Sequence, residues 1–292
     1  MSAAARSGIQ SHLTVTFPIK SPADRKALVE KLPMWMPFFA EAQDTEGSVH
    51  YSRFLDLSDQ ALLFIADIDG EADELVRALA RSAGPVFDAI LEHVENPPLA
   101  PVAHNTDAFV LWAKQHSTRP LVAYSAYVGN SVQEIKSCAR AAGFTGSSEQ
   151  HPLLLSLPLK SSLKAFILEE LVLRATHGKM NEGADSVGTL HFAHFVPLPD
   201  SHLAFFSIFD GSFHKYIEDF TEKLGPVFDT LFEFVSGPPP TPVAKNAETF
   251  FNWAEANNLP PIGMYCAYPG LAVQDIHALV ADAKVGTAAQ KA

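Results

Sequence analysis

The chain has 292 residues, of which 47% are hydrophobic and 18% charged, and it carries a formal net charge of −12 at pH 7. This length is sufficient for two hydrophobic cores of ordinary size. The negative charge and the lack of a Lys/Arg run argue against nucleic acid and an anionic membrane surface as partners. No apolar run approaches the roughly 20 residues of a membrane span, and the first residues lack the apolar core of a secretion signal, so a cytoplasmic protein is expected.

The same sequence pattern occurs twice along the chain. Asp69 returns as Asp210 (210 − 69 = 141), and the same step carries His50 onto His191. Further pairs are related in the same way: Gly84–Asp88 and Gly225–Asp229, Trp112 and Trp253, and Ala126-Tyr127 and Ala267-Tyr268. A step of this length predicts two duplicated domains, residues 1–145 and 146–292, and not a short-period solenoid. In such a covalent pseudo-dimer, shared residues are expected to support the fold, while differences between the halves are candidate functional asymmetries.

The first half begins with a strand and a helix, followed by two strands and a long helix, then a short helix, a strand and a final helix. The predicted ranges are Leu13–Ile19, Asp24–Leu32, Ser48–Leu57, Ala61–Ile68, Ala72–Val94, Asp107–Gln115, Leu121–Tyr127 and Ser131–Ala141. Gly84-Pro85 is expected to bend or split the long helix. The second half repeats the order in Leu153–Leu159, Ser162–Arg174, Thr189–Val196, Leu203–Phe209, Phe213–Val235, Ala247–Ala256, Ile262–Tyr268 and Val273–Ala283.

This order predicts an α+β fold of two tandem ferredoxin-like domains, each with helices on one face of an antiparallel sheet. Packing the two free sheet faces together would give one pseudo-dimeric α/β barrel. In element order and duplication the chain resembles the dimeric α/β-barrel families that include chlorite dismutase, dye-decolorising peroxidase and aldoxime dehydratase. The strand motif Thr189–Phe195, with a later strand ending in Phe209-Asp210-Gly211, also looks like a family of poorly characterised bacterial proteins described as peroxidase-like.

The resemblance implies peroxidase-like redox chemistry and, as a cofactor, haem. The available helical ligands in the second half are His214 and His277. The chain departs from the Gly-x-x-Asp-Gly motif of dye-decolorising peroxidases, because Ser207 stands three residues before Asp210. This departure puts haem binding in doubt, and the cofactor is otherwise unspecified.

Candidate catalytic residues lie on the second strand of each half. His50 and His191 are equivalent, and strand alternation predicts that Ser52 shares the face of His50. Arg53 corresponds to His194 (194 − 53 = 141). A guanidinium can hold an anion, whereas an imidazole can move a proton near neutral pH. This pair is therefore the sharpest asymmetry between the repeated strands.

Asp210 is the acid expected to act beside these groups. The full set of candidate catalytic residues is His191, His194, Asp210, Arg53 and His50. The alternative is that the histidines are hydrogen-bonded sheet residues and that Asp69 and Asp210 cap the helices that follow them. Because His191 and His194 would lie on opposite faces of a regular strand, no metal site is predicted.

The expected function is that of an enzyme acting on a small apolar or aromatic molecule, with a peroxidase-like haem oxidoreductase as the form that the resemblance implies. The many aromatic residues of the second half favour such a ligand. A cofactor-free lyase or isomerase and a non-catalytic ligand-binding protein remain open alternatives. A homodimer is a further open possibility.

Overall fold

The computed structural model describes residues 9–58, 61–161, 179–198 and 201–289. Its strands are β1 (Gln10–Pro18), β2 (Val49–Ser58), β3 (Ala61–Asp69), β4 (Val122–Ser125), β5 (Gln150–Pro158), β6 (Leu190–Leu198), β7 (His202–Asp210) and β8 (Pro261–Cys266). Its helices are α1 (Pro22–Glu46), α2 (Ala72–Ser82), α3 (Gly84–Leu91), α4 (Thr106–Gln115), α5 (Val132–Ala141), α7 (Lys179–Val187), α8 (Phe213–Phe232), α9 (Ala247–Asn257) and α10 (Val273–Ala289), with a 3-10 turn, η1 (Val243–Lys245). The repeated order is confirmed, while the helix predicted over Ser162–Arg174 lies outside the described residues.

Local sequence explains where several helices begin and break. The side chain of Ser21 caps α1 by accepting a hydrogen bond from the amide of Asp24 at 3.2 Å, and Pro22 occupies the first helical position. The helix then runs well beyond its predicted end. Gly84-Pro85 separates α2 from α3 as predicted, whereas the equivalent Gly-Pro pair of the second half lies inside the continuous helix α8.

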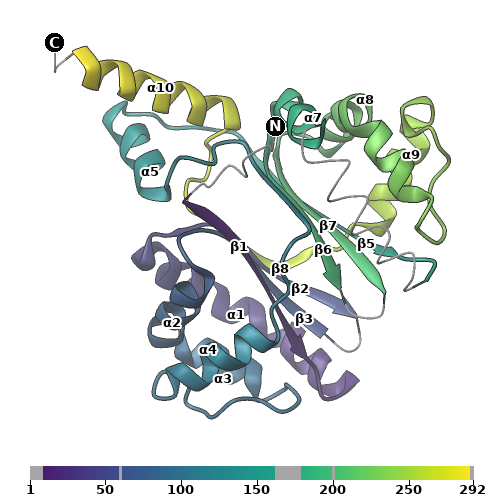
Figure 1. Cartoon of the computed structure of the whole chain (residues 1–292). Helices are drawn as coiled ribbons and strands as arrows, with labels where there is room; N and C mark the ends of the chain where they lie inside the picture. The colour runs from purple at the N-terminus through teal and green to yellow at the C-terminus, as the bar shows by residue number, and fades with distance from the viewer. Residues whose placement is uncertain (1–8, 59–60, 162–178, 199–200, 290–292) are drawn as a thin grey trace, which may run out of the picture.

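The strands form two four-stranded antiparallel sheets that face each other across the middle of the molecule (Figure 1). Their orders are β1-β3-β2-β8 and β4-β6-β7-β5. Strand β8, from the second half, completes the sheet of the first half, and β4 does the reverse. The exchange of the last strands ties the two ferredoxin-like halves together.

The two sheets do not close into one barrel within the described part of the chain, so the barrel prediction is wrong in this respect. The segment leading into β4 meets β1 only at an isolated bridge between Val15 and Ser117. The segment leading into β8 meets β5 only at a bridge between Leu155 and Asn258. A proline follows each bridge shortly afterwards in the sequence. Proline lacks the amide hydrogen that a continued ladder requires, which explains why pairing stops there.

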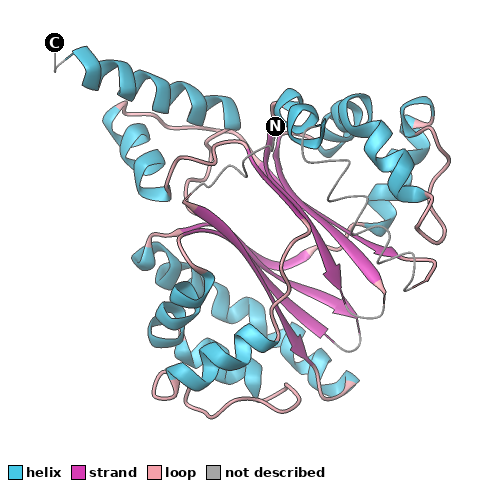
Figure 2. Cartoon of the chain, viewed as in Figure 1, coloured by secondary structure: helices cyan, strands magenta, loops and turns pink. Residues whose placement is uncertain are grey.

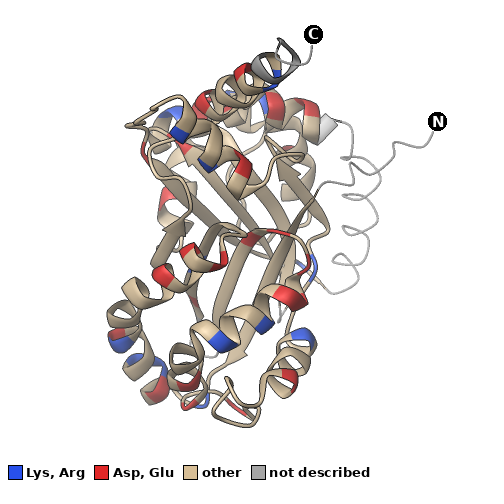
Figure 3. Ribbon diagram, turned by 90° about the vertical axis from the view of Figure 1, so that its left-hand side faces the viewer, with Lys and Arg blue, Asp and Glu red and all other residues tan. Residues whose placement is uncertain are grey.

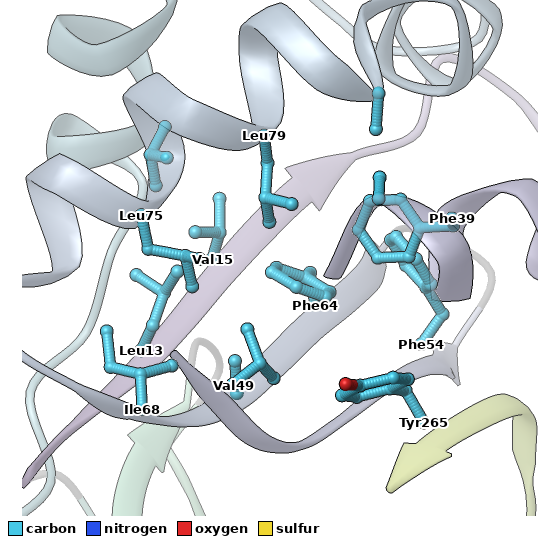
Figure 4. Packing of buried hydrophobic residues seen from close by; sticks show 14 of the residues in the cluster. Leu13, Val15, Phe39, Val49, Phe54, Phe64, Ile68, Leu75, Leu79 and Tyr265 are labelled. Carbon is cyan, nitrogen blue, oxygen red and sulfur yellow. The ribbon is translucent and has the colours of Figure 1, made fainter. Parts of the chain in front are cut away.

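Helices cover the outer faces of the sheets, and the inner faces pack against each other (Figure 2). In the outer core of the first half, Leu75 and Leu79 of α2 meet Leu13, Val15 and Phe64 of the sheet (Figure 4). A smaller apolar cluster fills the space between the sheets. It consists of Leu55, Leu63, Ile65, Leu154, Val196, Leu198, Ala204 and Phe206. Complete burial of such side chains stabilises the fold by about 1.5–3 kcal/mol each, so both faces of each sheet contribute.

Charged residues lie mostly on the helices, with acidic and basic side chains interspersed (Figure 3). The exceptions are strand residues whose charged side chains are buried, including Arg53, Asp67 and Asp210. Buried charge is costly unless it is paired, so these positions mark the part of the molecule where polar chemistry is concentrated. No described helix combines the length and the apolar character that crossing a membrane requires.

A β-bulge in each half changes which side chains share a face. The register of β2 against β3 shifts between Val49 and Tyr51, and that of β6 against β7 shifts at the equivalent place, so that His50 and His191 each occupy a bulge. The side chain of Ser52 bonds to α1 on the outer face, whereas His50 bonds to Tyr268, which follows β8. The prediction that His50 and Ser52 share a face is therefore wrong, because regular alternation does not hold through a bulge.

Candidate functional site

Six polar side chains form a hydrogen-bonded chain between the two halves, which we call the central network. In order, it comprises Asp69, His50, Tyr268, Tyr127, His191 and Asp210. Successive polar atoms lie 2.9, 2.8, 2.8, 2.9 and 2.7 Å apart. The repeat step of 141 (268 − 127 = 141) relates the members in pairs. The central network therefore has the pseudo-twofold symmetry of the chain.

Each carboxylate of the central network also accepts a backbone hydrogen bond at the start of a helix. Asp69 Oδ2 accepts from the amide of Val132 in α5 at 2.8 Å, and Asp210 Oδ2 accepts from that of Val273 in α10 at 2.7 Å. The capping role predicted for both aspartates is thus present, but the capped helices are distant in sequence and are not those that follow directly. Both oxygens of each carboxylate act as acceptors, which is the pattern of the ionised form.

The tyrosines of the central network remain neutral. Burial raises the pKa of Tyr127 and Tyr268 well above 10, so both hydroxyls keep their hydrogen. Tyr51 contacts the central network at His191, where its hydroxyl lies 3.2 Å from Nδ1. Its repeat counterpart is Phe192 (192 − 51 = 141), which offers no hydroxyl to the other histidine.

A second group of polar residues lies on the inner faces, and we call it the pocket cluster: His12, Arg53, Asp67 and His194. Asp67 Oδ1 accepts hydrogen bonds from His194 Nε2 at 2.6 Å and from His12 Nδ1 at 3.1 Å. The two imidazole rings stack with their centroids 3.7 Å apart. The other nitrogen of His12 lies 2.8 Å from the hydroxyl of Thr14. One carboxylate thus holds two imidazoles from opposite sheets.

Burial and mutual contact set the charges of the pocket cluster. Burial, with a further contribution from His194, lowers the pKa of His12 from 6.5 to about 4, so this imidazole is neutral at neutral pH. Burial alone would raise the pKa of Asp67, but the two imidazoles outweigh it and hold that pKa well below its usual range. Burial lowers the pKa of Arg53 to about 10, against the opposing charge of Asp67. The pocket cluster therefore contains an ionised carboxylate and a charged guanidinium that balance each other.

Four buried polar atoms of the pocket cluster have no hydrogen-bond partner within the described residues: Arg53 Nε, Arg53 Nη1, Asp67 Oδ2 and His194 Nδ1. The guanidinium carbon of Arg53 lies 5.7 Å from the centre of the Phe206 ring, a contact that leaves those N–H groups unpaired. Buried polar atoms without protein partners are rare in folded proteins and mark places where water, an ion or a ligand binds. Their concentration here distinguishes the pocket cluster from the central network.

The pocket cluster adjoins a pocket of about 620 Å³ where the edges of β1 and β4 separate. His12 and His194 line this pocket, and their side chains are only 2% and 4% exposed. The apolar part of the lining includes Leu13, Val76, Val110, Val128 and Phe192. Most of the remaining lining is polar, with Gln10, Ser11, Thr14, Glu71, Lys114 and Arg119 among its members. A volume of this size is typical of small-molecule sites.

The repeat does not reproduce the pocket cluster in a second place. Asp67 corresponds to Ile208 (208 − 67 = 141), and His12 corresponds to Pro152 at the step of 140 that holds for the early segment (152 − 12 = 140). Arg53 and His194 correspond to each other. The position equivalent to the carboxylate is therefore apolar, and the polar cluster occurs on one side of the pseudo-twofold relation only.

The predicted catalytic residues divide between the two groups. His50, His191 and Asp210 belong to the central network, whereas Arg53 and His194 belong to the pocket cluster. The predicted haem ligands lie elsewhere. His214 on α8 and His277 on α10 are exposed, neither lines the pocket, and His277 Nε2 bonds to the carbonyl of Ala126 at 2.9 Å.

Sequence reasoning missed His12 and Asp67, which complete the pocket cluster, and Tyr127 and Tyr268, which complete the central network. A signal existed for each pair. His12 and Asp67 are polar, whereas their counterparts in the other half, Pro152 and Ile208, are apolar. Tyr127 and Tyr268 are repeated residues that follow the last strand of each half. Comparison of every repeated pair by polarity would have selected them.

The pocket cluster also has the residue types of a metal site, because two imidazoles and a carboxylate lie with their ligand atoms within 4.8 Å of one another. The charge balance is unfavourable for a cation, since Arg53 already neutralises Asp67. The prediction that the chain has no metal site therefore stays a prediction, and metal analysis of the purified protein would check it.

No family model and no curated protein matches the chain. Among solved structures, a provisionally named monooxygenase from Fusobacterium nucleatum is similar, with a TM-score of 0.44 and 9% identity over 91% of this chain and 98% of that one. A provisionally named monooxygenase from Lactobacillus acidophilus has a TM-score of 0.40 and 9% identity over 90% and 99%. An anthrone oxidase-like protein has a TM-score of 0.31 and 9% identity over 92% and 98%. The resemblance to chlorite dismutase and dye-decolorising peroxidase is not confirmed by these likenesses, which are too distant to assign an activity.

Proposed function

We propose that the protein is an enzyme that removes a proton from a small molecule with an apolar or aromatic part, bound in the pocket. The observation that carries this proposal is the pair formed by Asp67 and His194. The carboxylate holds His194 Nε2 at 2.6 Å, while Nδ1 has no partner within the described residues. An imidazole that is oriented by a carboxylate through one nitrogen and free at the other is the arrangement of a general base.

In the proposed step, a C–H or O–H bond of the substrate breaks and its proton passes to His194 Nδ1. The electron pair stays on the substrate as an enolate or phenolate. Asp67 stabilises the imidazolium that forms. Arg53, which is buried in the same cluster but does not line the pocket, supplies a positive charge nearby that favours the new anion. His12, neutral at neutral pH, keeps the carboxylate in place from the opposite side.

The pocket suits a substrate with an apolar or aromatic part, polar substituents and one acidic proton. Its wall combines apolar side chains such as Val110 and Phe192 with polar ones, and the two histidines form its floor. Two cationic side chains lie at the edge of the pocket. Lys114 Nζ donates a hydrogen bond to Asp73 Oδ2 at 2.7 Å, and Arg119 is exposed to solvent. Reprotonation of the anion at another atom would make the enzyme an isomerase or lyase, and reaction of the anion with dioxygen would make it an oxygenase.

The peroxidase-like form of the function requires haem and a side chain that ligates its iron. The residues predicted for this role do not fit the pocket, because His214 and His277 are exposed and lie outside its lining. The haem prediction stays a prediction, and an absorbance spectrum of protein from haem-supplemented cells checks it. A stoichiometric Soret band would support the peroxidase-like function and overturn the proposal of a proton-abstracting enzyme.

Proton abstraction can be tested with a panel of compounds of the expected chemistry. Small aromatic and apolar ketones and phenols are screened for binding by thermal shift, and each bound compound is then incubated with the protein in D₂O under air. Mass spectrometry reports deuterium exchange at carbon, oxygen addition or bond cleavage. We expect at least one of these changes with the wild-type protein.

Two variants make the result specific. His194→Gln should lower the rate by about 100-fold or more, the usual size of a general-base contribution. His151→Gln is the matched control, since His151 has a side chain 45% exposed and does not line the pocket. Binding without exchange or turnover in the wild type would identify a non-catalytic ligand-binding protein. Equal rates in all three proteins would exclude His194 as the base.

A further inference from the structure

We propose that the central network is a binding site for one proton in addition to those carried by its neutral tyrosines and histidines. The proposal rests on counting hydrogens against contacts. The chain from Asp69 to Asp210 has five contacts of 2.7–2.9 Å, each within hydrogen-bond distance. Each of these contacts requires a hydrogen between its two heavy atoms.

The neutral side chains supply too few hydrogens. Each imidazole and each network tyrosine contributes one, which gives four hydrogens for five contacts, while the two ionised carboxylates contribute none. Tyr51 adds one hydrogen but also one further contact, with His191, so one hydrogen is still missing. If each imidazole donates to its carboxylate and each tyrosine donates to its imidazole, the contact between the hydroxyls of Tyr127 and Tyr268 has no hydrogen. Two oxygen lone pairs would then face each other at 2.8 Å in a buried site. A fifth hydrogen removes this conflict.

The shortage follows from the symmetry of the duplicated chain. The pseudo-twofold axis passes through the contact between the two tyrosines, so the other contacts occur in pairs and the total is odd. The side chains of the network are related in pairs, so the number of hydrogens that they supply is even. Loss of a tyrosine hydrogen would increase the shortage, and burial opposes it by raising the pKa of both hydroxyls well above 10. Symmetry therefore leaves uptake of a proton as the way to satisfy every contact.

The additional proton is located on the His191 side. Tyr51 places a second hydroxyl oxygen 3.2 Å from His191 Nδ1, next to that of Tyr127 at 2.9 Å. One N–H can be shared between two oxygen acceptors, whereas one nitrogen lone pair cannot accept two hydrogens with good geometry. A protonated Nδ1 suits this arrangement. His50, next to Phe192, has a single hydroxyl partner at that atom and accepts its hydrogen.

The proton also links the two halves. The contacts of His50 with Tyr268, of Tyr127 with Tyr268 and of Tyr127 with His191 each join the first half to the second. The network is therefore a buried proton store at the interface between the repeats.

Nitrogen NMR of the histidine rings in the full-length protein at neutral pH tests the proposal. In the wild type, we expect His191 to show both ring nitrogens protonated and His50 to show the neutral form with hydrogen on Nε2. Tyr127→Phe removes one hydroxyl and two contacts, and it leaves Tyr51 as the single hydroxyl at His191 Nδ1, so the remaining hydrogens suffice. In this variant, the imidazolium signal should disappear.

Two further variants separate the proton count from general disturbance of the core. Tyr216→Phe is the matched control, because Tyr216 is buried and donates to Ser207 at 3.0 Å outside the central network. It should leave the imidazolium signal unchanged. Tyr51→Phe removes the second hydroxyl at His191 Nδ1, so the imidazolium signal should then be shared between His50 and His191. Neutral rings at both histidines in the wild type, or an imidazolium that persists in Tyr127→Phe, would overturn the proposal.

Discussion

The central network and the pocket cluster lie on the same inner faces of the sheets and use similar side chains, but they differ in symmetry and in hydrogen bonding. The central network is built from residues that occur in both halves, and its carboxylates are paired at both oxygens. The pocket cluster is built where the repeat has diverged, and it contains four buried atoms without partners within the described residues. In this duplicated chain, repetition provides the interface between the halves, and divergence provides the candidate reaction centre.

The comparison predicts the largest stability effect for Asp67→Asn. The amide removes the charge that balances Arg53 and leaves a buried guanidinium uncompensated, which should lower the free energy of unfolding by about 3–5 kcal/mol at neutral pH. Denaturant unfolding measures this change. Asp107→Asn is the control, since Asp107 has a side chain 89% exposed and should have little effect.

The effect of Asp67 should also depend on pH in a known direction. Its pKa is held below the ordinary value of about 3.9, so its stabilising contribution is complete above that value and is lost as the pH falls further. The difference between wild type and Asp67→Asn should therefore shrink in acid. A constant difference across this range would show that charge is not the cause.

A smaller effect is expected from His12, and only over a defined pH range. Its pKa is about 4 in the folded protein and 6.5 in the unfolded chain. Between these values the unfolded chain binds a proton that the folded protein does not, so the free energy of unfolding falls as the pH decreases. The total loss is about 3 kcal/mol, at about 1.4 kcal/mol for each pH unit.

His12→Gln should remove this slope between pH 6.5 and 4, whatever its effect on stability at neutral pH. Unfolding measured at a series of pH values provides the test. His151→Gln changes an exposed histidine and should retain the slope. Retention of the wild-type slope in His12→Gln would mean that this buried imidazole is not the group that titrates.

Much of the fold could be predicted from periodicity, because alternating and helical patterns reflect burial on one face. The site could be predicted only in part. His50 and Arg53 share a face because a bulge interrupts β2, and pattern analysis assumes a regular strand. The partnership of Asp67 with His194 crosses between sheets, so it depends on how the halves pack and not on spacing along either strand. The failure to close a barrel likewise depends on where prolines stop the ladders.

The smallest expected effects belong to the central network, and the difference between its two ends is the informative feature. Asp69→Asn and Asp210→Asn each replace one acceptor oxygen by an NH₂ group, which cannot accept both from an imidazole and from a helix amide. Each variant should lower the free energy of unfolding by about 1.5–3 kcal/mol, as expected for a hydrogen bond to a charged group. Asp210 should be the more sensitive of the two, because it faces the imidazolium proposed at His191 and also has a contact with Ser148 at 3.2 Å, whereas Asp69 faces a neutral His50. Denaturant unfolding of both variants side by side gives the comparison. Equal losses, or a larger loss for Asp69→Asn, would contradict a proton held on the His191 side.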